Sequence, residues 1–194
     1  MNVRQLFSFL PVLLLALTAA GGLSSCGDNA ITRATREHQD QYAVIDDDTI
    51  QSYLKKNNYT TYTRTDDGVY IVPLVKGSGL AATTGKQVRV KYVGRVLSAN
   101  PDYTYLGSGP LPGNVFDNST ENHTACGCAV FTVGTGLVAG FSEGLTYMRQ
   151  GDRSLLLIPS RLAYGPTGSV SGSAYSIYPD SSLLFDVEVL EVSN

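Results

Sequence analysis

The sequence predicts an α+β domain in which an antiparallel sheet wraps around one short helix. Three observations support this fold: short apolar runs bounded by turn residues, one run that alternates apolar and polar side chains, and one well-placed internal helix. Several strands with one such helix favour an antiparallel sheet packed on that helix. We expect this domain to span residues 66–194.

The elements follow in order along the chain. Residues 88–97 begin with an apolar–polar alternation, which is typical of a half-buried antiparallel strand. Pro73, inside the apolar run 68–75, indicates an edge or a bulge, because proline donates no ladder hydrogen bond. Residues 141–148 are the expected helix. Further strands are expected at 131–133, 153–158 and 183–192.

Composition narrows the function classes. The chain has 194 residues, of which 43% are hydrophobic and 16% charged, and its formal net charge is -3. Its one block of like charge is acidic, so a basic nucleic-acid-binding face is excluded. One globular domain with appendages fits this length and composition.

The first 25 residues have the features of an export signal. Arg4 precedes an apolar run from Leu6 to Ala20, which is too short for a membrane span and is followed by small residues. Leu23-Ser24-Ser25-Cys26 resembles the lipobox of bacterial lipoproteins, which implies that Cys26 becomes the lipid-carrying first residue. An ordinary secretory signal with an incidental cysteine is the alternative. We therefore expect a lipid-anchored protein of the bacterial cell envelope, at the outer membrane or facing the periplasm.

Two segments are expected between the lipid and the domain. Residues 26–45 contain few apolar positions, which indicates a flexible tether. Residues 46–65 form a short helical extension, with a helix at 47–57 whose Ile50, Tyr53 and Leu54 share one face. A helix this short is unstable alone, so we expect it to pack on the domain.

The most specific stretch is residues 131–191. It contains Gly140-Phe141-Ser142-Glu143-Gly144, Ala163-Tyr164-Gly165 and Leu184-Phe185-Asp186. This sequence resembles the C-terminal half of the FKBP family of peptidyl-prolyl cis-trans isomerases, and the resemblance covers residues 66–192. It implies an FKBP-like fold, a half-open antiparallel sheet around one short helix.

The resemblance also implies an apolar pocket lined by aromatic side chains. The N–H of Val138 and the hydroxyl of Tyr164 would orient the substrate carbonyl, and Asp117 would polarise or support the pocket without acting as a base. Ile177 would belong to a flap beside it. The implied site residues are Tyr92, Phe116, Asp117, Leu137, Val138, Phe141, Tyr164, Ile177 and Phe185.

Departures from the family pattern bear on the function. Ala129 stands where an aromatic is common, and no arginine follows Asp117 as its buried partner. Insertions at 98–114 and 168–176 border the expected pocket, where they either tune binding or are neutral surface variation.

The implied activity is acceleration of X-Pro bond rotation in exported polypeptides, which assists their folding and needs neither cofactor nor metal. Rotation is opposed by about 18–20 kcal/mol of amide resonance, and an apolar cavity disfavours the planar, polar ground state more than the twisted transition state. The alternative is a non-catalytic polypeptide-binding module or chaperone on the same fold. We expect a monomer that binds proline-containing polypeptides and no nucleic acid, because residues 27–65 are too short for the helical arm of dimeric envelope relatives.

The remaining cysteines form a pair, Cys126 and Cys128. Exported proteins meet oxidising conditions, so a disulfide that staples this loop is expected. A thiol-disulfide enzyme is less favoured, because the spacing and the helix N-terminus that lower the pKa of a thiol are missing. His123 lies nearby, but the cluster lacks a fourth ligand and we expect no metal.

Overall fold

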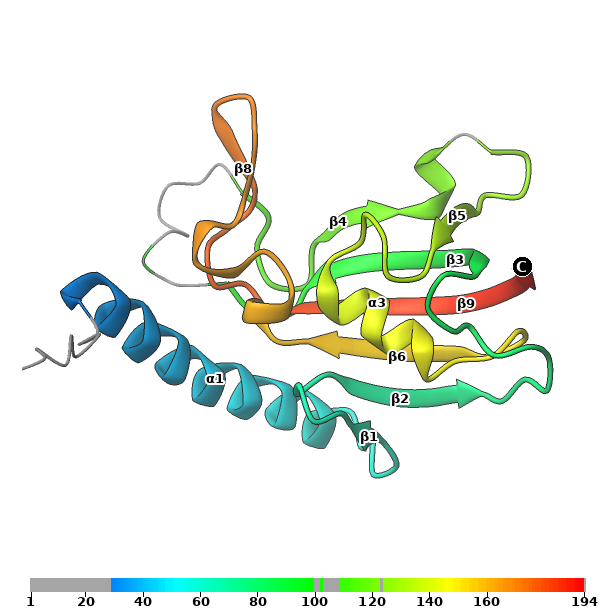
Figure 1. Cartoon of the computed structure of the whole chain (residues 1–194), viewed down its shortest axis with the longest axis horizontal. Coiled ribbons are helices and arrows are strands. Elements are labelled where there is room, and N and C mark those ends of the chain that lie inside the picture. The colour runs from blue at the N-terminus through cyan, green and yellow to red at the C-terminus, as the bar shows by residue number, and fades with distance from the viewer. Residues whose placement is uncertain (1–28, 100–101, 103–108, 123, 194) are drawn as a thin grey trace, which may run out of the picture.

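The centre of the molecule is an antiparallel sheet with a helix against each face (Figure 1). The structure is a computed structural model that describes residues 29–99, 102, 109–122 and 124–193. The expected signal segment and Cys26 lie outside the described residues. The α+β prediction, a sheet around one short helix, is confirmed for the part that packs on the internal helix.

The sheet has seven strands in the order β1-β2-β6-β9-β3-β4, and β5 also pairs with β3. Figure 1 shows the long β3 and β9 side by side at its centre. A separate hairpin, β7 and β8, lies inside the second insertion. The strands are β1 Thr63–Arg64, β2 Tyr70–Val75, β3 Gln87–Val96, β4 Val115–Asn118, β5 Ala129–Thr132, β6 Arg153–Ile158, β7 Ser169–Ser171, β8 Ala174–Ile177 and β9 Leu183–Ser193.

The helices are α1 Ala30–Lys56 and α3 Ala139–Thr146, with 3₁₀ turns η1 Ser119–Asn122, η2 Ser160–Leu162 and η3 Gly165–Thr167. The predicted internal strands and helix are all present, with ends shifted by a few residues. The bulge indicated by Pro73 is also present, because the pairing of β2 with β6 shifts between Pro73 and Val75.

Both faces of the sheet are buried along β6. Leu156 and Ile158 face α3 in the larger core, whereas Leu155 and Leu157 face α1 in a second core. A strand covered on both sides needs apolar residues at every position, which explains the continuous run Leu155-Leu156-Leu157-Ile158.

Two glycines let α3 lie close to this strand. A Cβ on Gly140 would be 2.4 Å from Cγ2 of Ile158, and one on Gly144 would be 2.6 Å from Cδ1 of Leu156. The two glycines are four residues apart and so share one helix face. Their lack of a side chain brings the N-terminus of α3 down to the sheet, where the candidate site lies.

The N-terminal helix is much longer than expected. It begins at Ala30, where Asn29 caps it by accepting a 2.8 Å hydrogen bond from the N–H of Thr32, and its 27 residues are about 40 Å long. The prediction of a flexible tether is therefore wrong from Ala30 onward. The expected monomer stays a prediction, although a helix of 27 residues does precede the domain. The expected packing of the helix on the domain is confirmed, since Ile50 and Leu54 are buried against the sheet.

No helix within the described residues is both long enough and apolar enough to cross a lipid bilayer.

Candidate active site

One edge of β3 is shared by two strands, and the candidate site lies where they meet. β4 pairs with Val93, Gly94 and Arg95, and β5 pairs with the residues from Gln87 to Val90. Tyr92 lies between these two pairings. Side chains from β3, β4 and β5 therefore converge on the face that carries α3.

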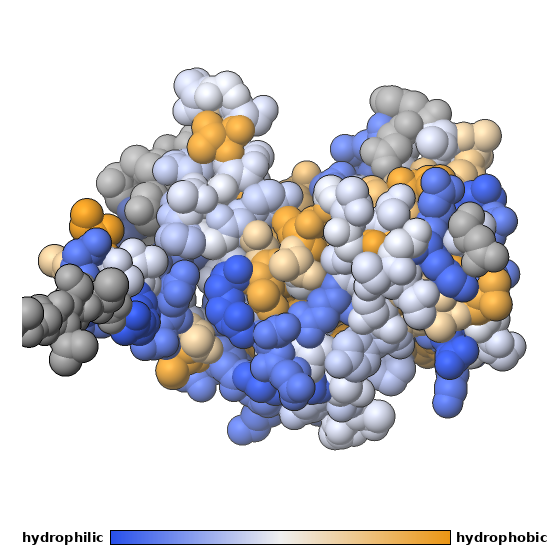
Figure 2. Space-filling model, viewed as in Figure 1, coloured by the Kyte–Doolittle hydropathy of each residue, from blue (hydrophilic) through white to orange (hydrophobic). Residues whose placement is uncertain are grey.

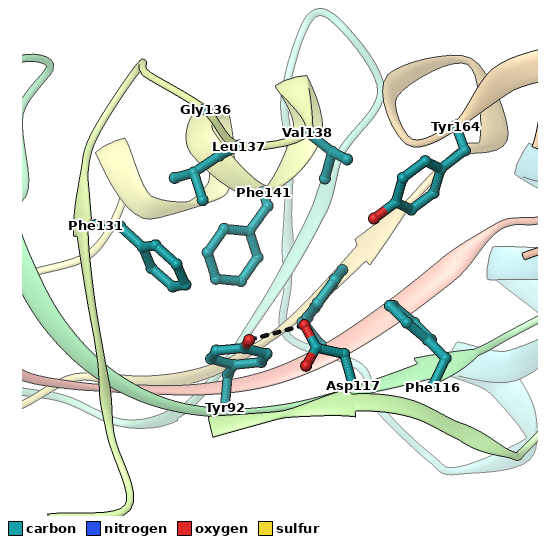
Figure 3. A pocket seen from close by; sticks show the side chains of 10 residues that line it. Tyr92, Phe116, Asp117, Phe131, Gly136, Leu137, Val138, Phe141 and Tyr164 are labelled. Carbon is teal, nitrogen blue, oxygen red and sulfur yellow. Dashed lines mark hydrogen bonds between the residues drawn. The ribbon is translucent and has the colours of Figure 1, made fainter. Parts of the chain in front are cut away.

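These side chains enclose a pocket of about 390 Å³ (Figure 3). Figure 2 shows it as a hollow with apolar surface near the middle of the molecule, between the raised β7–β8 hairpin and the loop that joins β4 to β5. Its volume and largely aromatic lining suit a small apolar ring. It is lined by Tyr92, Phe116, Asp117, Phe131, Gly136, Leu137, Val138, Phe141, Tyr164 and Phe185.

The floor of the pocket is a cluster of aromatic rings in contact. The centroid of Phe185 lies 4.8 Å from that of Phe141 and 5.6 Å from that of Phe116, the second pair at 85°. Tyr92 and Phe131 extend the cluster, each with its centroid 5.9 Å from that of Phe141. Tilted and edge-to-face pairs at these distances contribute about 0.5–1.5 kcal/mol each, so the rings hold one another in place.

A glycine makes room for two of these rings. Gly94 of β3 pairs with Phe185 on β9 and with Asp117 on β4. A Cβ on Gly94 would lie 2.8 Å from the Phe185 ring and 2.9 Å from the Phe116 ring. The absence of a side chain at Gly94 is therefore a condition for this wall of the pocket.

Asp117 has a partner that the sequence did not indicate. The hydroxyl of Tyr92 donates a 2.8 Å hydrogen bond to Oδ2 of Asp117, shown by the dashed line in Figure 3. The expectation that this carboxylate lacks a partner because no arginine follows it is wrong. Tyr92 is itself buried among the aromatic rings, so the bond fixes the carboxylate at the pocket wall.

Two hydrogen-bond donors belong to residues that line the pocket. Tyr164 extends its hydroxyl into the pocket from the segment after β6 (Figure 3), and this hydroxyl has no hydrogen-bond partner among the described residues. Partial burial raises the pKa of Tyr164, and the negative charge of Asp117 raises it further, so the hydroxyl stays protonated. Val138 is the N-cap of α3, and within the described part of the chain its N–H is also unpaired. Both groups can donate to a carbonyl oxygen held above the rings.

The sequence of this domain matches a known family. The model of the family described as FKBP-type peptidyl-prolyl cis-trans isomerase matches residues 79–190, which is more than half of the chain. The chain belongs to this family.

Individual relatives agree with this FKBP assignment. The chain is 31% identical over 139 residues to FK506-binding protein 4 of Dictyostelium discoideum, and 32% identical over 141 residues to the FKBP-type 22 kDa peptidyl-prolyl cis-trans isomerase of Escherichia coli. These alignments cover 70% and 72% of this chain but only 31% and 58% of the relatives. The chain thus spans less than two thirds of the length of these relatives.

A solved structure extends the similarity to the fold. The crystal structure of a peptidyl-prolyl cis-trans isomerase from Pseudomonas syringae superposes with a TM-score of 0.55 at 25% identity, covering 87% of this chain and 100% of the other. The predicted FKBP-like fold is confirmed.

Eight of the nine site residues predicted for this FKBP domain line the pocket, and Ile177 does not. Ile177 ends β8 with 2% of its surface exposed and belongs to the larger core. Its side chain therefore packs in the core at the base of the hairpin, and its membership of a flap beside the pocket stays a prediction.

Sequence reasoning missed Phe131. Ala129 stands where an aromatic is common, which on its own would leave a gap in one wall of the pocket. Phe131 lies two residues further along β5, on the same face, and its ring contacts Tyr92 and Phe141. The period of two in a strand is the signal that could have found it.

The first insertion contacts the chain that follows the second. The hydroxyl of Tyr178, which follows the second insertion, accepts a 2.8 Å hydrogen bond from the N–H of Gly109 in the first. The N–H of Leu97 donates to the carbonyl of Ser182 at 2.8 Å. The first insertion is thereby fastened to the chain between β8 and β9.

Cys126 and Cys128 are joined by a disulfide in the loop before β5. Between them, the carbonyl of Gly127 accepts a 2.8 Å hydrogen bond from the hydroxyl of Ser119, which in turn accepts one of 3.1 Å from the N–H of Tyr92. These bonds fix the loop to β3 and agree with a stapling role. His123 lies outside the described residues, and the rest of the described chain holds no group of three metal-ligating side chains.

Proposed function

We propose that this chain is a peptidyl-prolyl cis-trans isomerase that acts on proline-containing polypeptides. The observation that carries the proposal is the pocket itself: walls of contacting aromatic rings, two free donors at the opening and one fixed carboxylate, with membership of the FKBP family. Its volume of about 390 Å³ accommodates a proline ring and part of the preceding residue.

The mechanism needs no covalent step. Uncatalysed exchange at an X-Pro bond takes tens to hundreds of seconds, because the amide must lose its conjugation to rotate. The twisted amide is less polar than the planar one, so the rings of Phe141 and Phe185 destabilise the bound ground state relative to the transition state. The N–H of Val138 and the hydroxyl of Tyr164 would hold the carbonyl while the proline ring stays in the pocket.

The fixed carboxylate favours turnover over mere binding. Two departures from the family pattern, Ala129 and the missing arginine after Asp117, are arguments for a non-catalytic binding module. Phe131 supplies an aromatic wall, and Tyr92 supplies a partner for Asp117. The argument from an unpartnered carboxylate is therefore removed, and the aromatic ring of Phe131 weakens the argument from Ala129.

A protease-coupled assay of X-Pro isomerisation on the full chain tests the proposal. Tyr164→Phe removes one donor and keeps the ring, so we expect kcat/KM to fall about tenfold, or about 1.4 kcal/mol of transition-state stabilisation. The matched control is Tyr147→Phe, because Tyr147 is an exposed tyrosine outside the pocket. Peptide binding by the wild-type chain without any acceleration of exchange would establish the binding module instead.

We propose further that the protein resides in the bacterial cell envelope and is held there by lipid on Cys26. The support is the apolar run before Leu23-Ser24-Ser25-Cys26 in the sequence. Labelling with a radioactive fatty acid tests this proposal: label is expected on the wild-type chain and absent from Cys26→Ser. Equal labelling of both chains refutes the anchor.

A further inference from the structure

The pocket donor Tyr164 belongs to a long irregular connection. Residues 160–182 join β6 to β9 and contain two 3₁₀ turns and the β7–β8 hairpin. We call this connection the rim segment. It contributes no strand to the main sheet, so the position of Tyr164 depends on contacts that the rim segment makes elsewhere.

We propose that Asp46 and His38 of α1 are positioning residues that hold the rim segment, and with it Tyr164, over the pocket. In this arrangement the N-terminal helix supports catalysis from outside the site. The inference rests on the proposed isomerase function only where its test measures activity.

Asp46 binds both ends of the rim segment. It is 1% exposed, and its Oδ2 accepts hydrogen bonds from the N–H and the hydroxyl of Ser160, at 2.8 and 2.7 Å. Its Oδ1 accepts a 2.5 Å hydrogen bond from the hydroxyl of Ser182. Ser160 begins η2, four residues before Tyr164, and Ser182 directly precedes β9. One carboxylate therefore fastens the point where the rim segment leaves the sheet to the point where it returns.

His38 reaches the middle of the same segment. Its Nε2 lies 2.8 Å from Oδ1 of Asp180, whose side chain is 5% exposed. The N–H of Asp180 donates a 2.9 Å hydrogen bond to the carbonyl of Gly165, the residue after Tyr164. Two hydrogen bonds thus connect α1 to the backbone beside the pocket donor.

Docking of α1 does not by itself require these polar contacts. Ile50 and Leu54 already bury the C-terminal half of the helix against the sheet. Burial of a carboxylate is costly, and an apolar residue in its place is often as stabilising or more so. A carboxylate that accepts three directed hydrogen bonds fixes orientation, which an apolar contact does not. This is the property that a support for Tyr164 needs.

The sequence offers a direct probe of the inference, because the chain contains no tryptophan. Tyr164→Trp places a single indole on the rim segment, and its quenching by acrylamide reports how freely this position moves and meets solvent. We expect Asp46→Ala in this background to raise the quenching constant about twofold. Asp46→Asn keeps an acceptor for Ser160 and gains a donor for Ser182, so it should restore the wild-type value. The matched control is Asp48→Ala, the removal of an exposed carboxylate on the same helix.

The activity arm uses Tyr164 unchanged. We expect kcat/KM for X-Pro isomerisation to fall about fivefold in Asp46→Ala, and to stay within about twofold of wild type in Asp46→Asn and Asp48→Ala. If the wild-type chain is inactive, the proposed function fails, yet the quenching of the introduced indole still decides the positioning role.

A second variant keeps the test decisive. Should Asp46→Ala not fold by circular dichroism, His38→Ala takes its place, because His38 is 37% exposed and its loss leaves both cores intact. A folded variant in which the indole is quenched no more readily than in the Tyr164→Trp chain alone overturns the inference.

Discussion

The hydrogen bond between Tyr92 and Asp117 can be abolished by deleting one heavy atom, the hydroxyl oxygen of Tyr92. In Tyr92→Phe the ring stays among Phe131, Phe141 and Phe185, while Asp117 loses the donor that lies 2.8 Å from its Oδ2. A hydrogen bond to a charged group contributes about 1.5–3 kcal/mol to stability. We expect a loss of about 2 kcal/mol in the free energy of unfolding, which lowers Tm by about 4–8 °C in a chain of this size.

The assay is a double-mutant cycle of Tyr92→Phe with Asp117→Ala, in which urea unfolding measures the stability of each variant. If the tyrosine hydroxyl acts through this carboxylate, Tyr92→Phe costs about 2 kcal/mol in the wild-type background and less than about 0.5 kcal/mol once Asp117 is gone. Tyr147→Phe, at an exposed tyrosine, is expected to change stability by less than about 0.5 kcal/mol. An equal loss in both Asp117 backgrounds refutes the reasoning. The same variant should lower kcat/KM about fivefold, because the carboxylate is no longer fixed at the pocket wall.

Two further predictions follow from other contacts. Phe131→Ala opens one wall of the pocket and is expected to lower kcat/KM about tenfold, whereas Val130→Ala on the exposed face of β5 leaves it unchanged; equal activity of both variants would exclude Phe131 from the site. Burial raises the pKa of Asp46 above its ordinary value of 3.8, so the folded state holds this proton to a higher pH than the unfolded chain does. The stability that Asp46 contributes is therefore fully present below pH 3.8 and is lost as pH rises through the folded pKa. Urea titrations at a series of pH values should show wild type losing stability relative to Asp46→Asn over that window, and a constant difference would contradict a raised pKa.

The sequence was most informative about the sheet and the pocket. Residues 88–97 show the alternation of a half-buried strand. The segments around Phe141, Tyr164 and Phe185 combine sequence motifs of the family with an apolar pattern. Tyr92 lies on β3 and Phe116 on β4, which pair with each other, so both side chains line the same pocket once the register is set. The bond between Tyr92 and Asp117 was not predictable, because the sequence does not show how close two side chains on neighbouring strands approach.

The N-terminal helix was predictable only in its last third. Ile50, Tyr53 and Leu54 mark an apolar face, but the residues before Asp46 are mostly exposed and polar. A helix that buries little surface lacks the periodic signal on which such predictions depend. Asp46 looked like one member of the acidic run Asp46-Asp47-Asp48, and nothing in that run indicates which carboxylate is buried.

The second core, on the sheet face away from the pocket, has a practical consequence. The end of α1 covers Val72, Leu155, Leu157 and Leu184. A protein trimmed to residues 66–194 would therefore expose these side chains to water as one hydrophobic patch. We expect such a fragment to aggregate in solution even though every pocket residue is present. For this FKBP domain, the smallest fragment expected to stay monodisperse begins within α1.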